Sequence, residues 1–136
     1  MGKVGKYYHY INATTVVSGV GTTYNASKKQ TFVMSSQNFN GNIESLFITV
    51  SDIAGGCSAL TVRICVDANG DYSAIGDVQV IIDKGITTAT VGTCQILIDI
   101  PYQTVTGASP YNTLYVFFKC DAGSCNITQG QIGWSE

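Results

Sequence analysis

Hydrophobic and polar residues alternate with a period of two in segment after segment of the chain. Such alternation sends successive side chains to opposite faces of a β-strand, so that one face can pack on a core. In the segment 60–67, aliphatic residues at every second position alternate with Thr61, Arg63, Cys65 and Asp67. The pattern recurs at four other places: Leu46, Ile48 and Val50; Val78, Val80 and Ile82; Ile96, Ile98 and Ile100; and Leu114, Val116 and Phe118. Each of these segments is predicted to be a strand.

The segment 114–119 differs from the others because both of its faces are apolar. Tyr115 and Phe117 alternate with the aliphatic and aromatic residues of the core face. A strand with two apolar faces is typical of a central position or of an interface. The strand is therefore predicted to lie at the centre of a sheet or at an interface where a second chain covers its other face.

Shorter strands are expected at 7–11, 14–17, 30–34 and 126–134, and turn residues separate the segments. The turn signals are Asn40-Gly41, Gly55-Gly56, Asn69-Gly70, Gly85, Gly107 and Asp121-Ala122-Gly123, and Pro101 follows the strand expected to end at Ile100. About eight strands at regular spacing predict an all-β fold, an antiparallel β-sandwich of the jelly-roll type. We expect an N-terminal arm over residues 1–12 and one sandwich domain over 13–136.

The surface of this sandwich is predicted to be mostly neutral. Only 12% of the 136 residues are charged, about half of the usual share in soluble domains. Uncharged polar groups cost little to dehydrate, whereas Lys and Glu are depleted at the centres of interfaces. The composition therefore favours a protein that binds or assembles.

Charge and hydropathy argue against nucleic-acid and membrane partners. The net charge is −2 and the chain has seven basic residues, whereas phosphate backbones are bound by clustered Lys and Arg. No segment has the roughly 20 apolar residues of a membrane span. Tyr7, Tyr8 and His9 stand where a secretory leader would have its apolar region, so we expect synthesis in the cytoplasm.

Five cysteines cannot all pair within one chain. Buried free thiols are the default in a reducing compartment. A disulfide between Cys120 and Cys125 is the best alternative, because a four-residue turn can bring the two ends of a hairpin within bridging range. A zinc site is disfavoured by the absence of paired C-x-x-C spacings and by a single histidine.

One acidic segment has part of the pattern of a calcium loop. Asp67, Asn69 and Asp71 place oxygen ligands at alternating positions around Gly70, and Asp77 follows. The twelfth position, where an EF-hand loop needs a carboxylate, is Val78. The alternative interpretation is a type I′ hairpin turn at Asn69-Gly70. No other cofactor is expected.

The sequence carries no specific signal of catalysis. A nucleophile–histidine–acid triad would have to use His9, and no G-x-S-x-G elbow is present. Carboxylate pairs among Asp52, Asp83 and Asp99 are conceivable for glycoside hydrolysis, but nothing selects a pair. Tyrosine and tryptophan side chains suit two other roles, cross-strand packing or a platform on which sugars stack. Trp134 is expected to close one end of the sandwich.

The C-terminal stretch resembles a known family. The run 113–128, with its Cys120-Asp121-Ala122-Gly123-Ser124-Cys125 turn, and the ending Ile132-Gly133-Trp134-Ser135-Glu136 are similar to the last hairpin of small jelly-roll cement or decoration proteins of tailed-phage capsids. The resemblance implies a virion structural protein, commonly a homotrimer, that lies on the capsid surface and stabilises the shell by binding the major capsid protein between capsomers. Family members have no catalytic residues to carry over.

Two functions are therefore expected from the sequence. The first is that of a capsid cement, decoration or minor capsid protein, with Tyr7, Tyr8 and Tyr10 as interface anchors, since Tyr is enriched at hot spots. The alternative is a carbohydrate-binding β-sandwich module, at a fibre tip or appended to an enzyme.

Overall fold

The computed structural model describes residues 8–13, 16–25, 27–33, 40–67, 78–106 and 113–135. These residues form nine strands and no helix. The strands are β1 (Tyr8–Asn12), β2 (Val17–Val20), β3 (Lys29–Val33), β4 (Asn40–Ala54), β5 (Ala59–Asp67), β6 (Val78–Thr87), β7 (Gly92–Thr106), β8 (Thr113–Cys120) and β9 (Ser124–Ser135).

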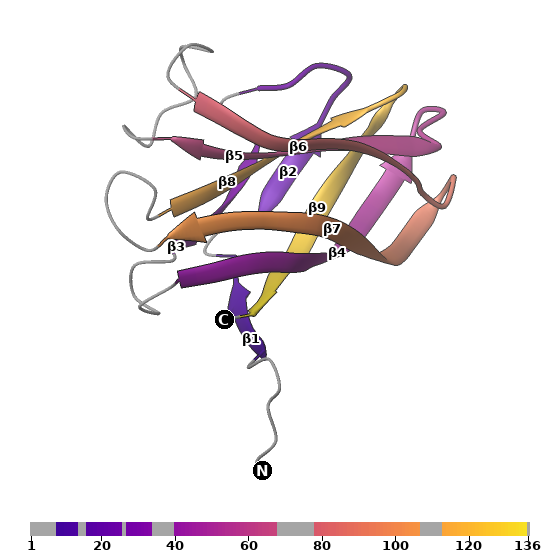
Figure 1. Cartoon of the computed structure of the whole chain (residues 1–136). Coiled ribbons are helices and arrows are strands. Elements are labelled where there is room, and N and C mark those ends of the chain that lie inside the picture. The colour runs from indigo at the N-terminus through magenta and orange to yellow at the C-terminus, as the bar shows by residue number, and fades with distance from the viewer. Residues whose placement is uncertain are drawn as a thin grey trace.

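The strands form two antiparallel sheets that lie face to face (Figure 1). Sheet A has the order β1-β9-β4-β7, and β2 pairs with the first part of β9. Sheet B has the order β3-β8-β5-β6. The predicted all-β antiparallel sandwich is confirmed, with nine strands in place of about eight. Residues 8–12 of the predicted arm form β1, which pairs with the end of β9.

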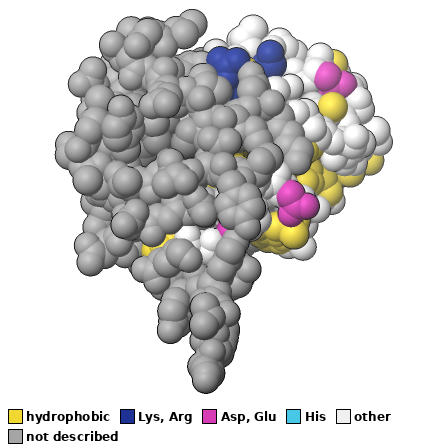
Figure 2. All heavy atoms as spheres, viewed as in Figure 1, with side chains coloured by type: hydrophobic (Ala, Val, Ile, Leu, Met, Phe, Trp, Pro, Cys, Tyr) yellow, Lys and Arg dark blue, Asp and Glu magenta, His cyan; other side chains and the backbone are white. Residues whose placement is uncertain are grey.

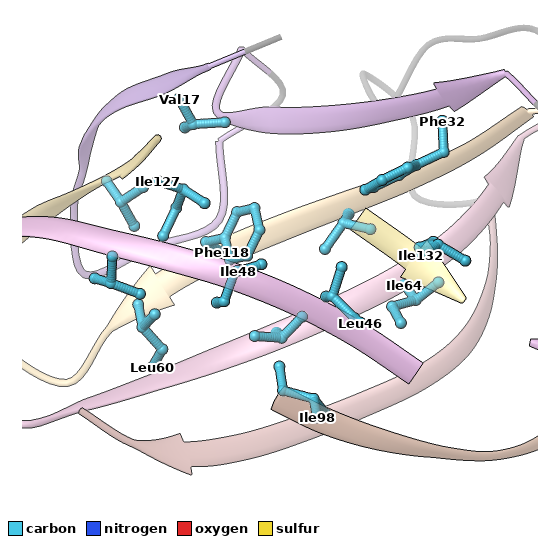
Figure 3. Close-up of a cluster of buried hydrophobic side chains, with 14 of the residues drawn as sticks. Val17, Phe32, Leu46, Ile48, Leu60, Ile64, Ile98, Phe118, Ile127 and Ile132 are labelled. Carbon is cyan, nitrogen blue, oxygen red and sulfur yellow. The ribbon is translucent and has the colours of Figure 1, made fainter. Parts of the chain in front are cut away.

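The core lies between the two sheets and consists of the inward residues of the alternating segments (Figure 3). Leu46, Ile48 and Val50 are fully buried from sheet A, and Leu114, Val116 and Phe118 are fully buried from sheet B. Burial of each such side chain stabilises the fold by about 1.5–3 kcal/mol relative to exposure. Trp134 is 1% exposed and belongs to this core.

Two of the expected turns are wrong. Asn40-Gly41 begins β4 and pairs with Thr106 and Val105, and Gly85 lies within β6 opposite Thr61. Glycine is compatible with an extended backbone, so the dipeptide signal was overridden by pairing with a neighbouring strand. Gly55-Gly56 and Asp121–Gly123 do connect strands, from β4 to β5 and from β8 to β9.

β7 does not end at Ile100, as the sequence suggested. It continues to Thr106, and its register with β4 shifts between the pairs Ser45↔Asp99 and Ile43↔Gln103. Pro101 lies within this irregularity. A bulge is one of the few places in a sheet where a missing N–H removes no ladder hydrogen bond.

The outer face of β8, which is also apolar, is covered by residues of the same chain. Tyr115 and Phe117 are 8% and 0% exposed, and with Cys65 they form a small cluster against which Tyr24 packs. The guanidinium of Arg63 lies 4.5 Å and the ammonium of Lys119 4.8 Å from the centre of the Tyr24 ring. The ring of Tyr24 therefore contacts both an apolar cluster and two cations, and the cations stabilise it through cation–π contacts. β8 lies between β3 and β5, so the prediction of a central strand is confirmed, and its outer face is covered within the chain.

Candidate functional site

The outer face of sheet A carries the candidate site. Because facing residues in an antiparallel ladder point to the same side of the sheet, the register defines rows of side chains that cross the strands. Two rows run from β1 to β7 and a third from β9 to β7. The rows are Tyr10, Gly133, Ser45 and Asp99; Asn12, Gln131, Phe47 and Leu97; and Gln129, Thr49 and Gln95.

These rows combine amides and hydroxyls with a few large apolar side chains and one exposed carboxylate, that of Asp99. Tyr10 and Leu97 are each 64% exposed, and Phe47 is half-buried between them. Gly133 positions the ring of Tyr10, because a Cβ at residue 133 would lie 2.8 Å from Ser45 Oγ and 3.2 Å from Tyr10 Cε1. The glycine thus leaves space for the ring to lie close to the sheet.

A cleft of about 450 Å³ opens on this face beside β9. It is lined by Asn12, Ala13, Val16, Phe47, Thr128, Gln129, Gly130 and Gln131, none of which is charged. β9 supplies its floor, Asn12 of β1 together with Ala13 and Val16 supplies one wall, and Phe47 of β4 lies opposite. The hydrogen bond from Ala13 N to Gly130 O, 2.8 Å long, ties the first wall to the floor.

Short hydrogen bonds orient the amides in and beside the cleft. Gln131 Nε2 donates to Asn12 Oδ1 at 3.1 Å, and Thr49 Oγ1 donates to Gln129 Oε1 at 3.1 Å. Each amide thus uses one of its two polar atoms and keeps the other for a ligand. Gln131 keeps an acceptor, whereas Gln129 and Asn12 keep donors. The cleft therefore presents both donors and acceptors without net charge.

Of this surface, the sequence indicated Tyr10 as an interface anchor and Asp99 as one of three carboxylates conceivable for glycoside hydrolysis. Tyr7 and the side chain of Tyr8 lie outside the described residues, and Tyr10 is exposed. The role of the three tyrosines as interface anchors stays a prediction. The amides were missed, although a signal existed. In the closing strand, outward positions that commonly carry Lys or Glu hold Gln129 and Gln131.

The calcium hypothesis falls outside the described part of the chain. Asn69, Asp71 and Asp77 lie in the segment 68–77, and Asp67 is described only by its backbone, at the end of β5. Among the described residues, no group of three or more His, Cys, Asp or Glu side chains is placed to hold a metal ion. Within the same residues, no helix is long and apolar enough to span a bilayer.

No family model and no curated protein matches this chain. Its structure is similar to a carbohydrate binding module from the glycoside hydrolase family 9 protein Cel9A of Ruminococcus flavefaciens. The TM-score is 0.55 at 11% identity, over 97% of this chain and 99% of the module. The two proteins share a β-sandwich fold.

Viral structures give weaker similarities. The tobacco streak virus coat protein matches with a TM-score of 0.41 at 11% identity, over 98% of this chain and 89% of the coat protein. A structure of infectious bursal disease virus, Gx strain, matches with a TM-score of 0.47 at 10% identity, over 96% of this chain and 32% of the viral chain. The resemblance to phage decoration proteins remains a prediction.

Proposed function

We propose that this chain is a non-catalytic binding module that holds a neutral glycan on the outer face of sheet A. The observation that supports the proposal best is the uncharged, amide-lined cleft between Asn12, Gln131 and Phe47. Its volume lies within the range of about 300–1,000 Å³ that is usual for small-ligand sites.

The chemistry of the cleft matches that of a sugar. Each sugar hydroxyl both donates and accepts hydrogen bonds, and the side-chain amides of Gln129 and Gln131 offer one free donor and one free acceptor. The C–H face of a sugar ring is apolar and packs on flat aromatic surface, which Phe47 provides at one side of the cleft.

The neutral surroundings favour uncharged glycans over acidic ones. Among the described residues no cation lines the cleft, so a carboxylate or sulfate group placed there would lose its hydration without gaining an ion pair. Where the view of Figure 2 shows described side chains, few of them are charged, and the Lys and Arg side chains lie at its upper edge. The Ruminococcus module that shares this fold is a carbohydrate binding module, which is consistent with the same ligand class.

The test is affinity electrophoresis in gels that contain neutral or acidic soluble polysaccharides. We expect retardation by at least one neutral polymer and none by acidic polymers. Phe47→Ala should weaken binding about tenfold or more through the lost ring contact, and Gln131→Ala about three- to tenfold through one lost hydrogen bond. Thr61→Ala, on the outer face of sheet B, is the matched control. Equal retardation of Phe47→Ala and the wild type would contradict the proposal.

A second candidate function is that of a virion structural protein, a capsid cement or decoration protein that binds the major capsid protein. The observation that favours it is the exposure of large apolar side chains in or beside sheet A. Tyr10 and Leu97 are each 64% exposed, Val16 62% and Val91 74%. Exposed apolar groups that gather on one face are typical of protein interfaces.

This candidate predicts self-association, with a trimer as the expected state. Leu97→Asp should shift the sedimentation coefficient toward that of the monomer, because it puts a charge into the apolar contact. A wild type that sediments as a monomer at all concentrations would contradict this candidate and leave the glycan proposal standing.

A further inference from the structure

Three cysteines meet at the end of the sandwich where the β4–β5 and β8–β9 connections lie. Cys57 belongs to the first connection, Cys120 ends β8, and Cys125 lies near the start of β9. All three are buried, with exposed fractions of 0%, 3% and 1%. All five cysteines of the chain are free thiols in this structure.

Two of these thiols are in direct contact. The Sγ atoms of Cys120 and Cys125 lie 3.5 Å apart, and Cys120 Sγ also approaches Val20 O at 3.5 Å. A disulfide bond is about 2.05 Å long, so small side-chain rotations would bring the two sulfurs to bonding distance. Cys57 Sγ approaches Ala59 O at 3.9 Å and also lies close enough to Cys120 and Cys125 to raise the pKa of both thiols.

The two cysteines belong to different sheets. Cys120 ends β8 in sheet B, and Cys125 lies in β9 in sheet A. The chain passes from one sheet to the other through Asp121, Ala122 and Gly123. A bond between the sulfurs would close this corner covalently.

We propose that Cys120 and Cys125 form a disulfide that ties sheet B to sheet A when the chain folds in an oxidising medium that contains a small-molecule disulfide. In the first step one cysteine thiolate attacks that disulfide, forms a mixed disulfide and releases one small thiol. The other cysteine then attacks the protein sulfur of the mixed disulfide and releases the second small thiol. Two protein thiols are oxidised to one disulfide, and one small disulfide is reduced to two thiols, which take up the two protons.

The bond forms during folding and not after it. Burial raises the pKa of the Cys125 thiol to about 11 and that of Cys120 still further, with the neighbouring thiols adding to the effect on Cys120. Because the thiolate is the attacking species, the folded, reduced pair reacts slowly. The thiols are accessible and their pKa values ordinary only while the chain is unfolded.

Tryptic peptides provide a direct test, because each cysteine outside the pair lies in a peptide of its own. Cleavage after Lys29, Arg63, Lys84 and Lys119 gives peptides 30–63, 64–84, 85–119 and 120–136, and the last one contains both Cys120 and Cys125. The chain is refolded with reduced and oxidised glutathione, alkylated under denaturing conditions and digested.

We expect peptide 120–136 to carry no alkyl group and to be two hydrogens lighter than its reduced form, while the other three peptides are alkylated. Two alkyl groups on peptide 120–136, or its linkage to the peptide of Cys57, would overturn the proposal. Cys57→Ser is the matched control and should leave the bridge intact, whereas Cys125→Ser should abolish it.

Thermal unfolding gives a second readout. The oxidised wild type should melt roughly 5 °C above the reduced form, because the bridge restricts the unfolded chain. Cys57→Ser should keep this difference and Cys125→Ser should lose it. Equal melting temperatures of the oxidised and reduced wild type would count against a role in tying the sheets. These readouts do not involve glycan binding, so either proposal can fail alone.

Discussion

At the residue scale, the carboxylate of Asp121 joins the two connections at the end of the sandwich. Asp121 Oδ1 accepts hydrogen bonds from Ser58 N at 2.9 Å and Ala59 N at 3.1 Å, and Oδ2 accepts one from Ser58 Oγ at 2.7 Å. These bonds, with one from Ala122 N, lower the pKa of the carboxyl group to about 2 from 3.8. The sequence predicts a turn at Asp121 but cannot indicate a partner that is 63 residues away.

Lowering the pH should therefore reduce the free energy of unfolding, because it protonates the carboxylate of Asp121. Its pKa is lower in the folded state, so its contribution is complete above about pH 4 and is lost as the pH falls toward 2. Asp121→Asn should be less stable at neutral pH and should lose less stability over this acidic range. The measurement is the urea midpoint at pH 7, 4 and 2, and parallel profiles of variant and wild type would contradict the assignment.

Gln30 is a polar residue in the core. It is 0% exposed, its two amide atoms have no hydrogen-bond partner among the described residues, and a Cβ on Gly130 would lie 2.2 Å from its Oε1. The glycine thus leaves space for an amide whose burial carries a desolvation cost. The alternation pattern could not show this, because a polar residue at the start of a short strand is normally assigned to the surface.

Gln30→Met should raise the free energy of unfolding by about 1–2 kcal/mol, because it replaces an unsatisfied amide with an apolar chain of similar shape. Chemical denaturation measures the change, and Gln131→Met on the outer face of sheet A serves as the control, with little effect expected. A less stable Gln30→Met would mean that the amide makes a stabilising hydrogen bond.

At the scale of elements, the sequence predicted strands far better than their ends and partners. The alternation of hydrophobic and polar residues predicted β5 and β8 and the face of each strand that packs on the core, because a period of two follows directly from strand geometry. The predictions of turns at Asn40-Gly41 and Gly85 were wrong because glycine also fits an extended strand. The sequence could not identify Tyr24 as the residue that packs on the outer face of β8, because Tyr24 is distant in sequence from that cluster.

The two connections at the corner pack so closely that they require glycine. Gly123 has φ of +64°, and a Cβ there would lie 2.1 Å from Ala54 O. Gly123→Ala should therefore lower the free energy of unfolding by about 3 kcal/mol, through backbone strain and the displacement of the β4–β5 connection.

Gly85→Ala is the matched control for this prediction. Gly85 lies in β6 without a positive φ, and a Cβ at this position would have no described atom within 4 Å, so its replacement should change stability little. Equal denaturation midpoints for the two variants would show that the corner does not need the glycine.

At the scale of the whole molecule, the two sheets differ in what they expose. On the described outer face of sheet B, Tyr24 packs over the sheet with Arg63 and Lys119 against its ring. The described outer face of sheet A is not covered in this way and carries the amide rows and the cleft. The composition predicted a neutral binding surface, but where that surface lies on the fold depends on the order of the strands in the sheet. Asn12, Gln131 and Phe47 come from three strands that are adjacent only in the folded sheet.

The central claim is that the outer face of sheet A binds a neutral glycan. The most direct measurement follows backbone amide NMR shifts while a neutral oligosaccharide, cut from the polymer that retards the protein in gels, is added. We predict saturable shifts at Phe47, Gln129 and Gln131 and none at Thr61 on sheet B. Shifts centred on Tyr24 and Lys119, or unchanged spectra at saturating oligosaccharide, would contradict the claim.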